Sequence, residues 1–512
     1  MLAKAISGAV LGIDAFRVDV EVDIGNGLPY YSTVGLPDTS VRESKERVQA
    51  ALKNSGFYNA SNKRVTVNLA PADVRKEGPA LDLAIGISIL AATGQLKGAR
   101  HLNLCLVGEL SLDGSLRPVS GVLPMAVAAR DMGLEGIVVP KGNAAEASVV
   151  EMLCAYPVEN LNDVVDFLQG SQEIVPHQTD MKALFKDAST EAVDFCDVRG
   201  QKQAKRALEV AAAGGHNILM VGPPGSGKTM LAKRLSTILP RMNLEEALET
   251  TKVHSTAGFL GGEKALISKR PFRSPHHTSS NVAMVGGGNS PRPGEVSLAH
   301  NGVLFMDELP EFKRDVLEVL RQPLEDGTVQ ISRASYSVTY PARLMLACAM
   351  NPCPCGFLTD TSKPCRCNPG QVVRYHSKVS GPLLDRIDIQ VDVPAVAYSE
   401  LSARKDGESS ALIRERIEAA RARQHGRFNG SGVHSNAAMS SRMVRELCVP
   451  DEAGEALLKT AITKLGFSAR AYDRILKVAR TIADLDGEEK ILAEHISEAI
   501  QYRCFDRGIG GF

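Results

Sequence analysis

A glycine-rich run is the part of this 512-residue chain whose residue types point most directly to chemistry. The run consists of Gly222, Pro223, Pro224, Gly225, Ser226, Gly227, Lys228 and Thr229. It lies between an apolar stretch and an amphipathic one, which is the strand–loop–helix order of a phosphate-binding loop. Glycines let backbone N–H groups surround phosphate oxygens, and the helix N-terminus adds a positive dipole end. The run predicts an ATP site in which Lys228 neutralises the β- and γ-phosphates and Thr229 holds Mg²⁺.

Two carboxylates follow a second apolar run at residues 303–306. These are Asp307 and Glu308, and unpaired charge at the end of a buried strand is costly unless it has a use. We expect Asp307 to bind Mg²⁺, directly or through water, and Glu308 to orient or deprotonate the attacking water. The alternative is a solvated strand end. Asn351 ends a third apolar run and could hold the same water, although a lone Asn there is more often a turn former.

A cluster of thiols follows Asn351 closely. Cys353, Cys355, Cys365 and Cys367 have the spacing C-x-C, nine residues, C-x-C. Four thiolates suit tetrahedral Zn²⁺, although zinc sites commonly use a spacing of two to four residues within each pair. A structural zinc is the favoured interpretation, and reduced metal-free thiols or a redox pair are the alternatives. The other six cysteines are scattered, which predicts reduced fillers without a shared site.

Two α/β regions and a helical tail must position these side chains. Residues 1–170 predict an α/β domain, 171–193 a polar linker, 194–395 a nucleotide-binding core with a parallel sheet, and 396–512 a helical lid. The expected strands cover residues 17–23, 64–68, 104–108, 136–140, 217–221, 303–306 and 344–350. The expected helices cover residues 40–54, 81–93, 230–239, 411–423, 442–447, 452–465, 469–484 and 491–502.

The overall composition gives no sign of a membrane or nucleic-acid partner. Lys plus Arg number 59 and Asp plus Glu also number 59, so no global basic field is present. No window approaches the ~20 apolar residues that a membrane span needs, and residues 5–13 predict a first strand rather than a signal peptide. We therefore expect a soluble, cytoplasmic protein without a membrane partner.

Longer motifs give a resemblance to a known family. They cover residues 270–278, 286–288, 291–295, 300–312, 351–356 and 381–388. With the phosphate loop, they resemble AAA+ ATPases, within these the magnesium-chelatase-like branch, and within that the ComM/YifB family. The resemblance runs from about residue 1 to 501. It implies an AAA+ P-loop core, a helical lid, and a homo-hexameric ring that hydrolyses ATP between subunits and acts on single-stranded or branched DNA.

The same resemblance implies a role in branch migration during natural transformation and assigns two arginines. Arg386, in the segment 383–388, is similar to the arginine finger that reaches the γ-phosphate of the neighbouring subunit. Arg470, at the start of a lid helix, is similar to the sensor-2 arginine, which could act within its own subunit or on the neighbour.

The first domain resembles the Lon-protease-like fold (S5-type, α+β). In the proteases, the segment similar to 78–80 carries a nucleophilic Ser and the segment similar to 118–129 carries its activating Lys. Here Ala80 takes the first position, and residues 121–125 contain no Lys. Without an oxygen nucleophile and an amine base, we expect no peptidase activity. The domain is expected to support the ring or to bind DNA.

Two insertions supply the predicted DNA contacts. The first is the Gly/Pro/basic stretch 257–293, with Lys269, Arg270 and Arg273, and the second is the hairpin 325–340, with Arg333 near its tip. The resemblance implies that such insertions point into the ring's pore, where a few cations per subunit suffice for sequence-blind phosphate contacts. The alternative is solvated loops with incidental charge.

Two functions therefore remain open. The first is a DNA-translocating ATPase motor with a neutral exterior and a locally basic channel. The second is an ATP-driven protein remodeller similar to the motor subunit of magnesium chelatase, which would need no DNA. Stimulation of ATP hydrolysis by DNA discriminates between them.

Overall fold

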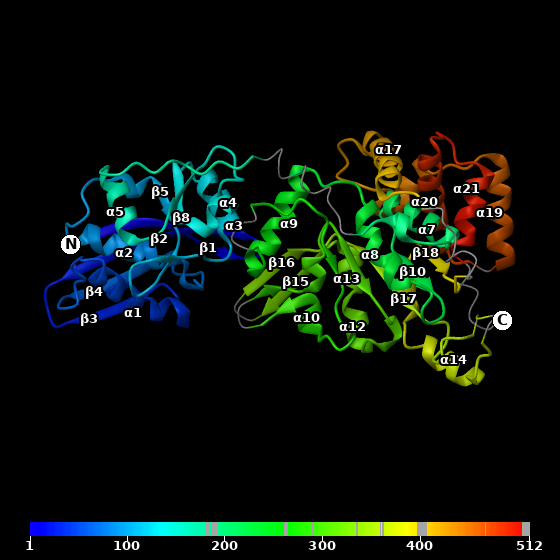
Figure 1. Ribbon diagram of the computed structural model, residues 1–512, viewed down its shortest axis with the longest axis horizontal. Coiled ribbons are helices and arrows are strands. Elements are labelled where there is room, and N and C mark those ends of the chain that lie inside the picture. The colour runs from blue at the N-terminus through cyan, green and yellow to red at the C-terminus, as the bar shows by residue number, and fades with distance from the viewer. Residues whose placement is uncertain are drawn as a thin grey trace.

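Two separate β-sheets organise the chain in the computed structural model (Figure 1). The structure describes residues 1–180, 185, 193–260, 265–288, 291–333, 336–358, 360, 363–396, 407–465 and 467–503. Residues 181–184 and 186–192 of the predicted linker 171–193 therefore lie outside the described residues. Its first part packs on the amino-terminal unit, since the backbone N–H of His177 donates to the Ala155 carbonyl at 2.9 Å.

The amino-terminal unit contains a mixed seven-stranded sheet in the order β3-β4-β2-β1-β5-β8-β9. Its strands are β1 (Leu2–Leu11), β2 (Asp14–Gly25), β3 (Tyr30–Val34), β4 (Arg64–Ala70), β5 (Leu104–Leu106), β8 (Gly136–Pro140) and β9 (Cys154–Val158), with a separate pair β6 (Glu109–Leu110) and β7 (Leu116–Arg117). One apolar cluster packs α1 (Thr39–Asn54), α2 (Asp82–Ala92) and α5 (Leu161–Gln169) against the sheet. A second packs α3 (Val122–Asp131) and α4 (Ala144–Ala147). The expected strands and helices of this domain are all found, with ends shifted by a few residues.

The second sheet has five parallel strands in the order β11-β14-β17-β10-β18. They are β10 (Ile218–Val221), β11 (Phe272–Arg273), β14 (Val303–Met306), β17 (Met345–Met350) and β18 (Ile389–Asp392). Successive side chains point to opposite faces of a strand. Accordingly, Ile218 and Met220 join one apolar cluster, and Leu219 and Val221 join the other. Strands β10, β14 and β17 are apolar throughout because helices or the hairpin cover both faces.

Helices surround this sheet. They are α7 (Lys202–Gly214), α8 (Lys228–Ile238), α9 (Leu244–Ala257), α10 (Asn281–Val285), α11 (Glu295–Leu298), α12 (Arg314–Val319), α13 (Arg321–Asp326), α14 (Pro369–His376) and α15 (Gly381–Leu384). Two small antiparallel pairs also occur, β12 (Gly286–Gly287) with β13 (Arg292–Pro293), and β15 (Thr328–Arg333) with β16 (Tyr336–Pro341). The predicted hairpin is therefore present, but its residue Glu325 belongs to α13.

The stretch 257–293 is only partly an insertion, which corrects the sequence interpretation. Phe272 and Arg273 form β11, which pairs with β14 at the edge of the main sheet. A two-residue strand is too short to produce an apolar alternation that sequence patterns can detect.

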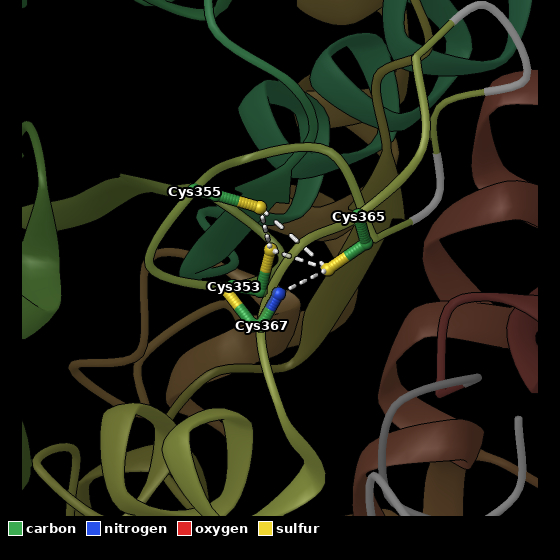
Figure 2. Close-up of side chains that lie close together, drawn as sticks. All are labelled: Cys353, Cys355, Cys365 and Cys367. Carbon is green, nitrogen blue, oxygen red and sulfur yellow. Dashed lines mark hydrogen bonds between the residues drawn. The ribbon is translucent and has the colours of Figure 1, made fainter.

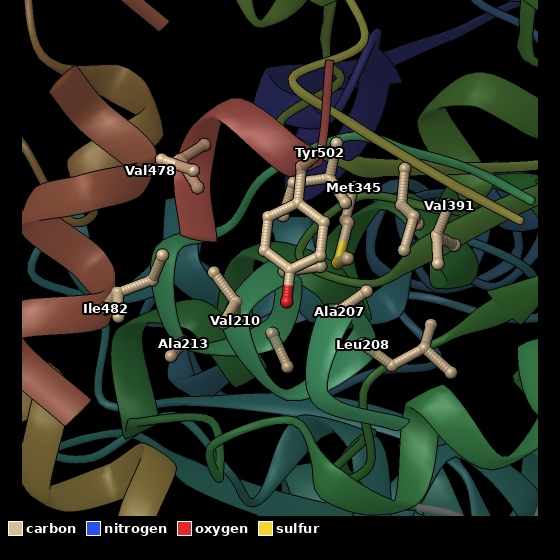
Figure 3. Packing of buried hydrophobic residues seen from close by; sticks show 14 of the residues in the cluster. Ala207, Leu208, Val210, Ala213, Met345, Val391, Val478, Ile482 and Tyr502 are labelled. Carbon is tan, nitrogen blue, oxygen red and sulfur yellow. The ribbon is translucent and has the colours of Figure 1, made fainter. Parts of the chain in front are cut away.

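The carboxyl-terminal unit is helical, as expected, but it shares its core with the sheet. Its helices are α17 (Ser410–Phe428), α18 (Ser441–Leu447), α19 (Glu452–Leu465), α20 (Ala469–Asp486) and α21 (Ala493–Gln501). Figure 3 shows Val478 and Ile482 of α20 beside residues of α7, with Tyr502 between them and the sheet. A displacement of α20 would therefore alter the packing against the sheet that carries the nucleotide loop.

The amino-terminal unit contacts the core through α3 and α9. The backbone N–H of Gly121 donates to the Ser255 carbonyl at 3.1 Å, and the Ser255 hydroxyl donates to the buried carboxylate of Glu146. An ion pair of 3.0 Å between Lys252 and Asp14 adds to this interface. None of the described helices is both long and apolar enough to cross a membrane.

Candidate active site

The glycine-rich run forms a loop between β10 and α8, as predicted. Gly225 and Gly227 have φ angles of 78° and 93°, in the left-handed region that favours glycine. The ammonium group of Lys228 donates to the carbonyls of Gly222 at 2.7 Å and Pro223 at 2.8 Å. Helix α8 begins at Lys228, two residues earlier than expected, so its amino end faces the loop. These features fit a bound triphosphate.

Burial tunes the lysine of this loop. Lys228 is 8% exposed, and its desolvation lowers the pKa of the ammonium group, against the opposing charges of Asp307 and Glu308. Phosphate oxygens would supply the negative charge that the buried ammonium lacks.

The predicted magnesium ligands lie together. The Thr229 hydroxyl donates to a carboxylate oxygen of Asp307 at 2.7 Å, although the two residues are 78 positions apart in the sequence. Thr229 follows β10 and Asp307 follows β14, and parallel strands bring their carboxyl ends to one edge of the sheet. Hydroxyl and carboxylate oxygens are ligands that Mg²⁺ accepts, so the pair fits this ion.

Glu308 adopts an unusual backbone conformation. Its φ angle is 52°, a left-handed value that costs a non-glycine residue about 1 kcal/mol or more. This turn exposes the carboxylate at the edge of the sheet. The imidazole Nδ1 of His277 lies 3.8 Å from Glu308 Oε2, a neighbour that the sequence interpretation did not assign. His277 belongs to the motif 270–278, and only the fold brings that motif to the acidic pair.

Asn351 also reaches this edge. It follows β17, and its side-chain oxygen lies 3.3 Å from the ammonium nitrogen of Lys228, which donates to it. The structure therefore brings Lys228, Thr229, Asp307 and Asn351 together, with Glu308 beside them.

Arg386 lies at the opposite edge of the same sheet. Its carbonyl accepts a hydrogen bond of 2.8 Å from the side chain of Asn217, which precedes β10, whereas the phosphate loop follows β10. The four residues of β10 separate the two edges by about 13 Å. The Arg386 guanidinium is 11% exposed, and it pairs with Glu325 and donates to the Pro382 carbonyl at 2.6 Å. Arg386 thus points away from its own phosphate loop.

Arg470 belongs to the same edge as Arg386. Its guanidinium lies 3.3 Å from the carboxylate of Asp385, the residue before Arg386, and is 69% exposed. The Ser468 hydroxyl caps α20 just before it. The tertiary structure therefore groups the two assigned arginines, which are 84 positions apart in the sequence.

A buried polar network supports this arginine edge. The carboxylate of Asp388 lies 2.9 Å from His216 and 3.4 Å from Arg474 of α20. The second imidazole nitrogen of His216 lies 2.8 Å from the Thr481 hydroxyl, also on α20. Burial would raise the pKa of Asp388, but the His216 hydrogen bond and the nearby cations lower it below its ordinary value. The network ties the Arg386 segment to the lid.

The four clustered thiols face one another (Figure 2). Their ligand atoms all lie within 4.8 Å of one another. Three sulfur–sulfur distances are 3.4, 3.7 and 3.6 Å, and tetrahedral Zn²⁺ with bonds of about 2.3 Å requires about 3.8 Å. The backbone N–H of Arg366 lowers the pKa of the Cys355 thiol to about 6, whereas burial raises the pKa of the Cys353 thiol to about 12. The described cysteines form no disulfide.

The cysteine loop packs on the phosphate loop. A Cβ atom at Gly356 would lie 2.5 Å from Pro224, and Gly356 has a φ angle of 85°. Only glycine permits this approach, so the cluster can brace the nucleotide loop from outside.

The predicted DNA-contact residues have different surroundings. Arg270 donates to three backbone carbonyls and pairs with Glu246 at 2.9 Å, and Arg273 forms two bonds of 2.7 Å with Glu295. Both guanidinium groups are therefore engaged within the chain. Lys269 is exposed, and Arg333 is the last residue of β15, where its backbone pairs with Tyr336 of β16.

The amino-terminal domain has no nucleophile at the position singled out in the sequence. Ala80 is buried within a short 3-10 turn, Pro79–Leu81, and its methyl side chain cannot act as a nucleophile.

Comparison with family models and known proteins follows this division of the chain. Residues 194–401 match "Magnesium chelatase, subunit ChlI", residues 20–143 match "Subunit ChlI of Mg-chelatase", and residues 407–503 match "Magnesium chelatase, subunit ChlI C-terminal".

Full-length relatives are also found. The chain is 46% identical over 511 residues to the Competence protein ComM of Haemophilus influenzae, covering 99% of this chain and 98% of that protein. It is 45% identical over 506 residues to the Uncharacterized protein YifB of Escherichia coli, covering 98% and 96%. Lon protease 2 of Bacillus subtilis is 30% identical over 161 residues, which cover 28% of this chain and 27% of that protease.

Proposed function

The chain belongs to the ComM/YifB family of magnesium-chelatase-like AAA+ ATPases, and from this premise we propose that it is an ATP-driven ring motor acting on DNA. The relative named Competence protein ComM supports a competence-related role. The proposed reaction is ATP hydrolysis coupled to DNA translocation, with branch migration as its outcome.

One observation carries the ring. The phosphate loop and Arg386 lie at opposite edges of one sheet, so a single subunit cannot bring its own Arg386 to its own nucleotide. A head-to-tail neighbour can, and head-to-tail contacts close into rings when the rotation permits. We propose a homo-hexamer in which Arg386, with Arg470 beside it, completes the site of the next subunit.

Each residue of the chain then has a defined task. Bound ATP and Mg²⁺ supply the reactive phosphate and its charge neutralisation. Lys228 binds the phosphate, Thr229 and Asp307 orient the ion, and Glu308 takes the proton of the attacking water. Asn351 holds that water in place. Its side-chain oxygen lies 3.3 Å from the ammonium nitrogen of Lys228. The charge of Arg386 stabilises the transition state from the neighbour, an effect of about 10³–10⁵ in rate.

Zinc is the proposed occupant of the cysteine cluster. The sulfur geometry supports it, as does the contact between Gly356 and Pro224, which gives a metal-braced loop a direct effect on nucleotide binding. Metal analysis of the purified protein should find about one zinc per chain. A content well below one would contradict the proposal.

DNA contact remains proposed for the hairpin and for Lys269, Arg270, Arg273 and Arg333. The two ion-paired arginines would have to exchange Glu246 and Glu295 for phosphate. Arg333→Ala should weaken the stimulation of ATP hydrolysis by DNA relative to the basal rate. A parallel fall of both rates would argue against a DNA role for Arg333.

The decisive experiment is a strand-displacement and branch-migration assay on the purified protein. Labelled forked and four-way DNA substrates are incubated with ATP, and Lys228→Ala serves as the control. ATP-dependent product with the natural chain, and none with Lys228→Ala, supports the proposal. Absence of product and of DNA-stimulated hydrolysis with several DNA structures would contradict it.

The second candidate is an ATP-dependent protein remodeller. The matches to magnesium chelatase subunit models over all three regions favour it. ATP hydrolysis that responds to a protein partner and not to DNA would identify this function.

A further inference from the structure

A surface groove borders the cysteine cluster, and two of the clustered thiols, Cys355 and Cys367, belong to its lining. Its volume is about 430 Å³, and its cationic lining comes from Arg366, Arg374 and Lys378. Glu311 and Tyr375 complete much of the remaining wall. Arg366 lies between two of the clustered cysteines, and Arg374 belongs to α14.

The charge of the groove is unbalanced. Lys378 lies 3.2 Å from the Glu311 carboxylate, but both groups are about half exposed. Arg366 and Arg374 are exposed, and neither guanidinium forms an ion pair among the described residues. Three cations therefore face one carboxylate. An excess of unpaired cations in a groove attracts anionic ligands, and phosphate is the anion that guanidinium groups recognise best.

The cations are mounted on ordered elements. The N–H of Cys367 donates to the Cys365 sulfur at 3.4 Å, which constrains the turn that carries Arg366 between them. Helix α14 begins with a reciprocal capping box between Asn368 and Gln371. A ligand bound here would thus lose little free energy in ordering the backbone of the groove.

The groove also contacts the ATP site through apolar packing and backbone hydrogen bonds. Tyr375 packs in the same apolar cluster as Met350, the residue before Asn351. The imidazole of His376 lies 2.8 Å from the Pro352 carbonyl. The N–H of Glu311 donates to the Glu308 carbonyl at 2.7 Å. A ligand in the groove can therefore shift the two segments that position the attacking water.

We propose that this groove binds the phosphodiester backbone of a single DNA strand, and that its occupation is sensed at Asn351 and Glu308. The inference rests on the proposed DNA motor function and assigns it a contact site outside both predicted insertions. Sequence-blind phosphate contacts need exposed cations rather than base-reading side chains, which matches Arg366 and Arg374.

The test compares the double variant Arg366→Ala/Arg374→Ala with the natural full-length chain. The probe is a fluorescein-labelled single-stranded oligonucleotide of about 40 nucleotides, long enough for several contact sites. Anisotropy gives the affinity over a salt series. We expect affinity to fall by about tenfold or more, and the log–log salt slope to become less steep by about 0.7 for each lost contact.

A matched control removes the same charge elsewhere. Arg445→Ala/Lys459→Ala takes two exposed cations from the helical unit and should leave affinity and slope unchanged. Zinc content and nucleotide affinity of each variant report correct folding. Competition by inorganic phosphate or free ATP at the same ionic strength distinguishes a strand from a small phosphate ligand.

Each outcome is decisive. If the natural chain and Arg366→Ala/Arg374→Ala bind with equal affinity and salt slope, the proposal that the groove binds DNA is overturned. The proposed motor function is then unaffected. No binding of any DNA by the natural chain overturns both. Displacement of the strand from the groove by stoichiometric free phosphate identifies a small-anion site and overturns the assignment to DNA.

Discussion

The two edges of the five-stranded sheet differ in how complete they are. At the carboxyl edge, Thr229 contacts Asp307 at 2.7 Å and Lys228 contacts Asn351 at 3.3 Å. At the amino edge, the Arg386 guanidinium is held by Glu325 and a carbonyl, and its buried Nε has no acceptor among the described residues. The first edge has a preformed geometry for a nucleotide, whereas the second presents charge that no nucleotide of the same chain can use.

This difference indicates which edge determines nucleotide binding and which determines turnover. In the proposed ring, nucleotide binding needs only the carboxyl edge, so we expect it to survive in a single subunit. In the same ring, fast hydrolysis needs both edges, so we expect it to depend on assembly. Changes at the two edges should therefore separate binding from turnover.

The largest effect is expected for Arg386→Ala. Hydrolysis should fall by about 10³-fold because transition-state charge loses its partner, while ATP binding persists. Steady-state ATPase rates and a fluorescent-nucleotide titration measure the two quantities.

Mixed rings make this prediction sharper. Lys228→Ala subunits retain Arg386, and Arg386→Ala subunits retain the phosphate loop. In an equal mixture, about a quarter of the interfaces should combine an intact phosphate loop with an intact Arg386. ATPase activity should be recovered in that proportion if the arginine acts on its neighbour. A mixture as inactive as its components would show that the two edges do not meet between subunits.

Arg470→Ala should lower turnover by about 10²-fold, with a smaller effect on ATP affinity. The reason is its place beside Asp385 at the arginine edge. Arg442→Ala is the control, since Arg442 is an exposed lid arginine paired only with Glu446 on its own helix among the described residues. A loss of ATP affinity without a loss of turnover would indicate that Arg470 contacts the nucleotide of its own subunit.

Asp388→Asn should destabilise the arginine edge by about 2 kcal/mol because it weakens charged hydrogen bonds to His216 and Arg474. A carboxylate whose pKa is lowered by folding contributes stability above its ordinary value of 3.8 and loses it as pH falls below that value. Denaturant unfolding at neutral pH should therefore reveal the difference, which should shrink only as the pH falls below 3.8. An unchanged midpoint would mean that the network does not hold the edge.

Gly356→Ala should weaken ATP binding by about tenfold, or about 1.4 kcal/mol. The new Cβ would lie 2.5 Å from Pro224 at a φ angle of 85° and would displace the phosphate loop. Gly381→Ala, at the arginine side, is the control because nothing lies within 4 Å of its Cβ position. Equal nucleotide affinities of the two variants would show that the cysteine loop does not affect ATP binding.

Much of the nucleotide site could be predicted from the sequence because its chemistry is local. The run 222–229 contains its glycines, lysine and threonine in one loop, and Asp307 and Glu308 follow a strand that the apolar pattern reveals. Strand β11 was missed because its two residues are too few to show an alternation of apolar and polar side chains. The contacts of Arg270 and Arg273 with Glu246 and Glu295 were missed because a sequence pattern does not reveal which distant carboxylate a basic side chain will meet.

The sequence by itself determined the family, the nucleotide loop and the four thiols that could hold zinc, since residue type and short spacing decide these. Only the tertiary structure decided that Arg386 and Arg470 share the edge opposite Lys228, that Gly356 touches Pro224, and that Arg366, Arg374 and Lys378 line one groove. The physical reason is that strand order and direction place residues at an edge, and both are settled by packing between segments far apart in the chain.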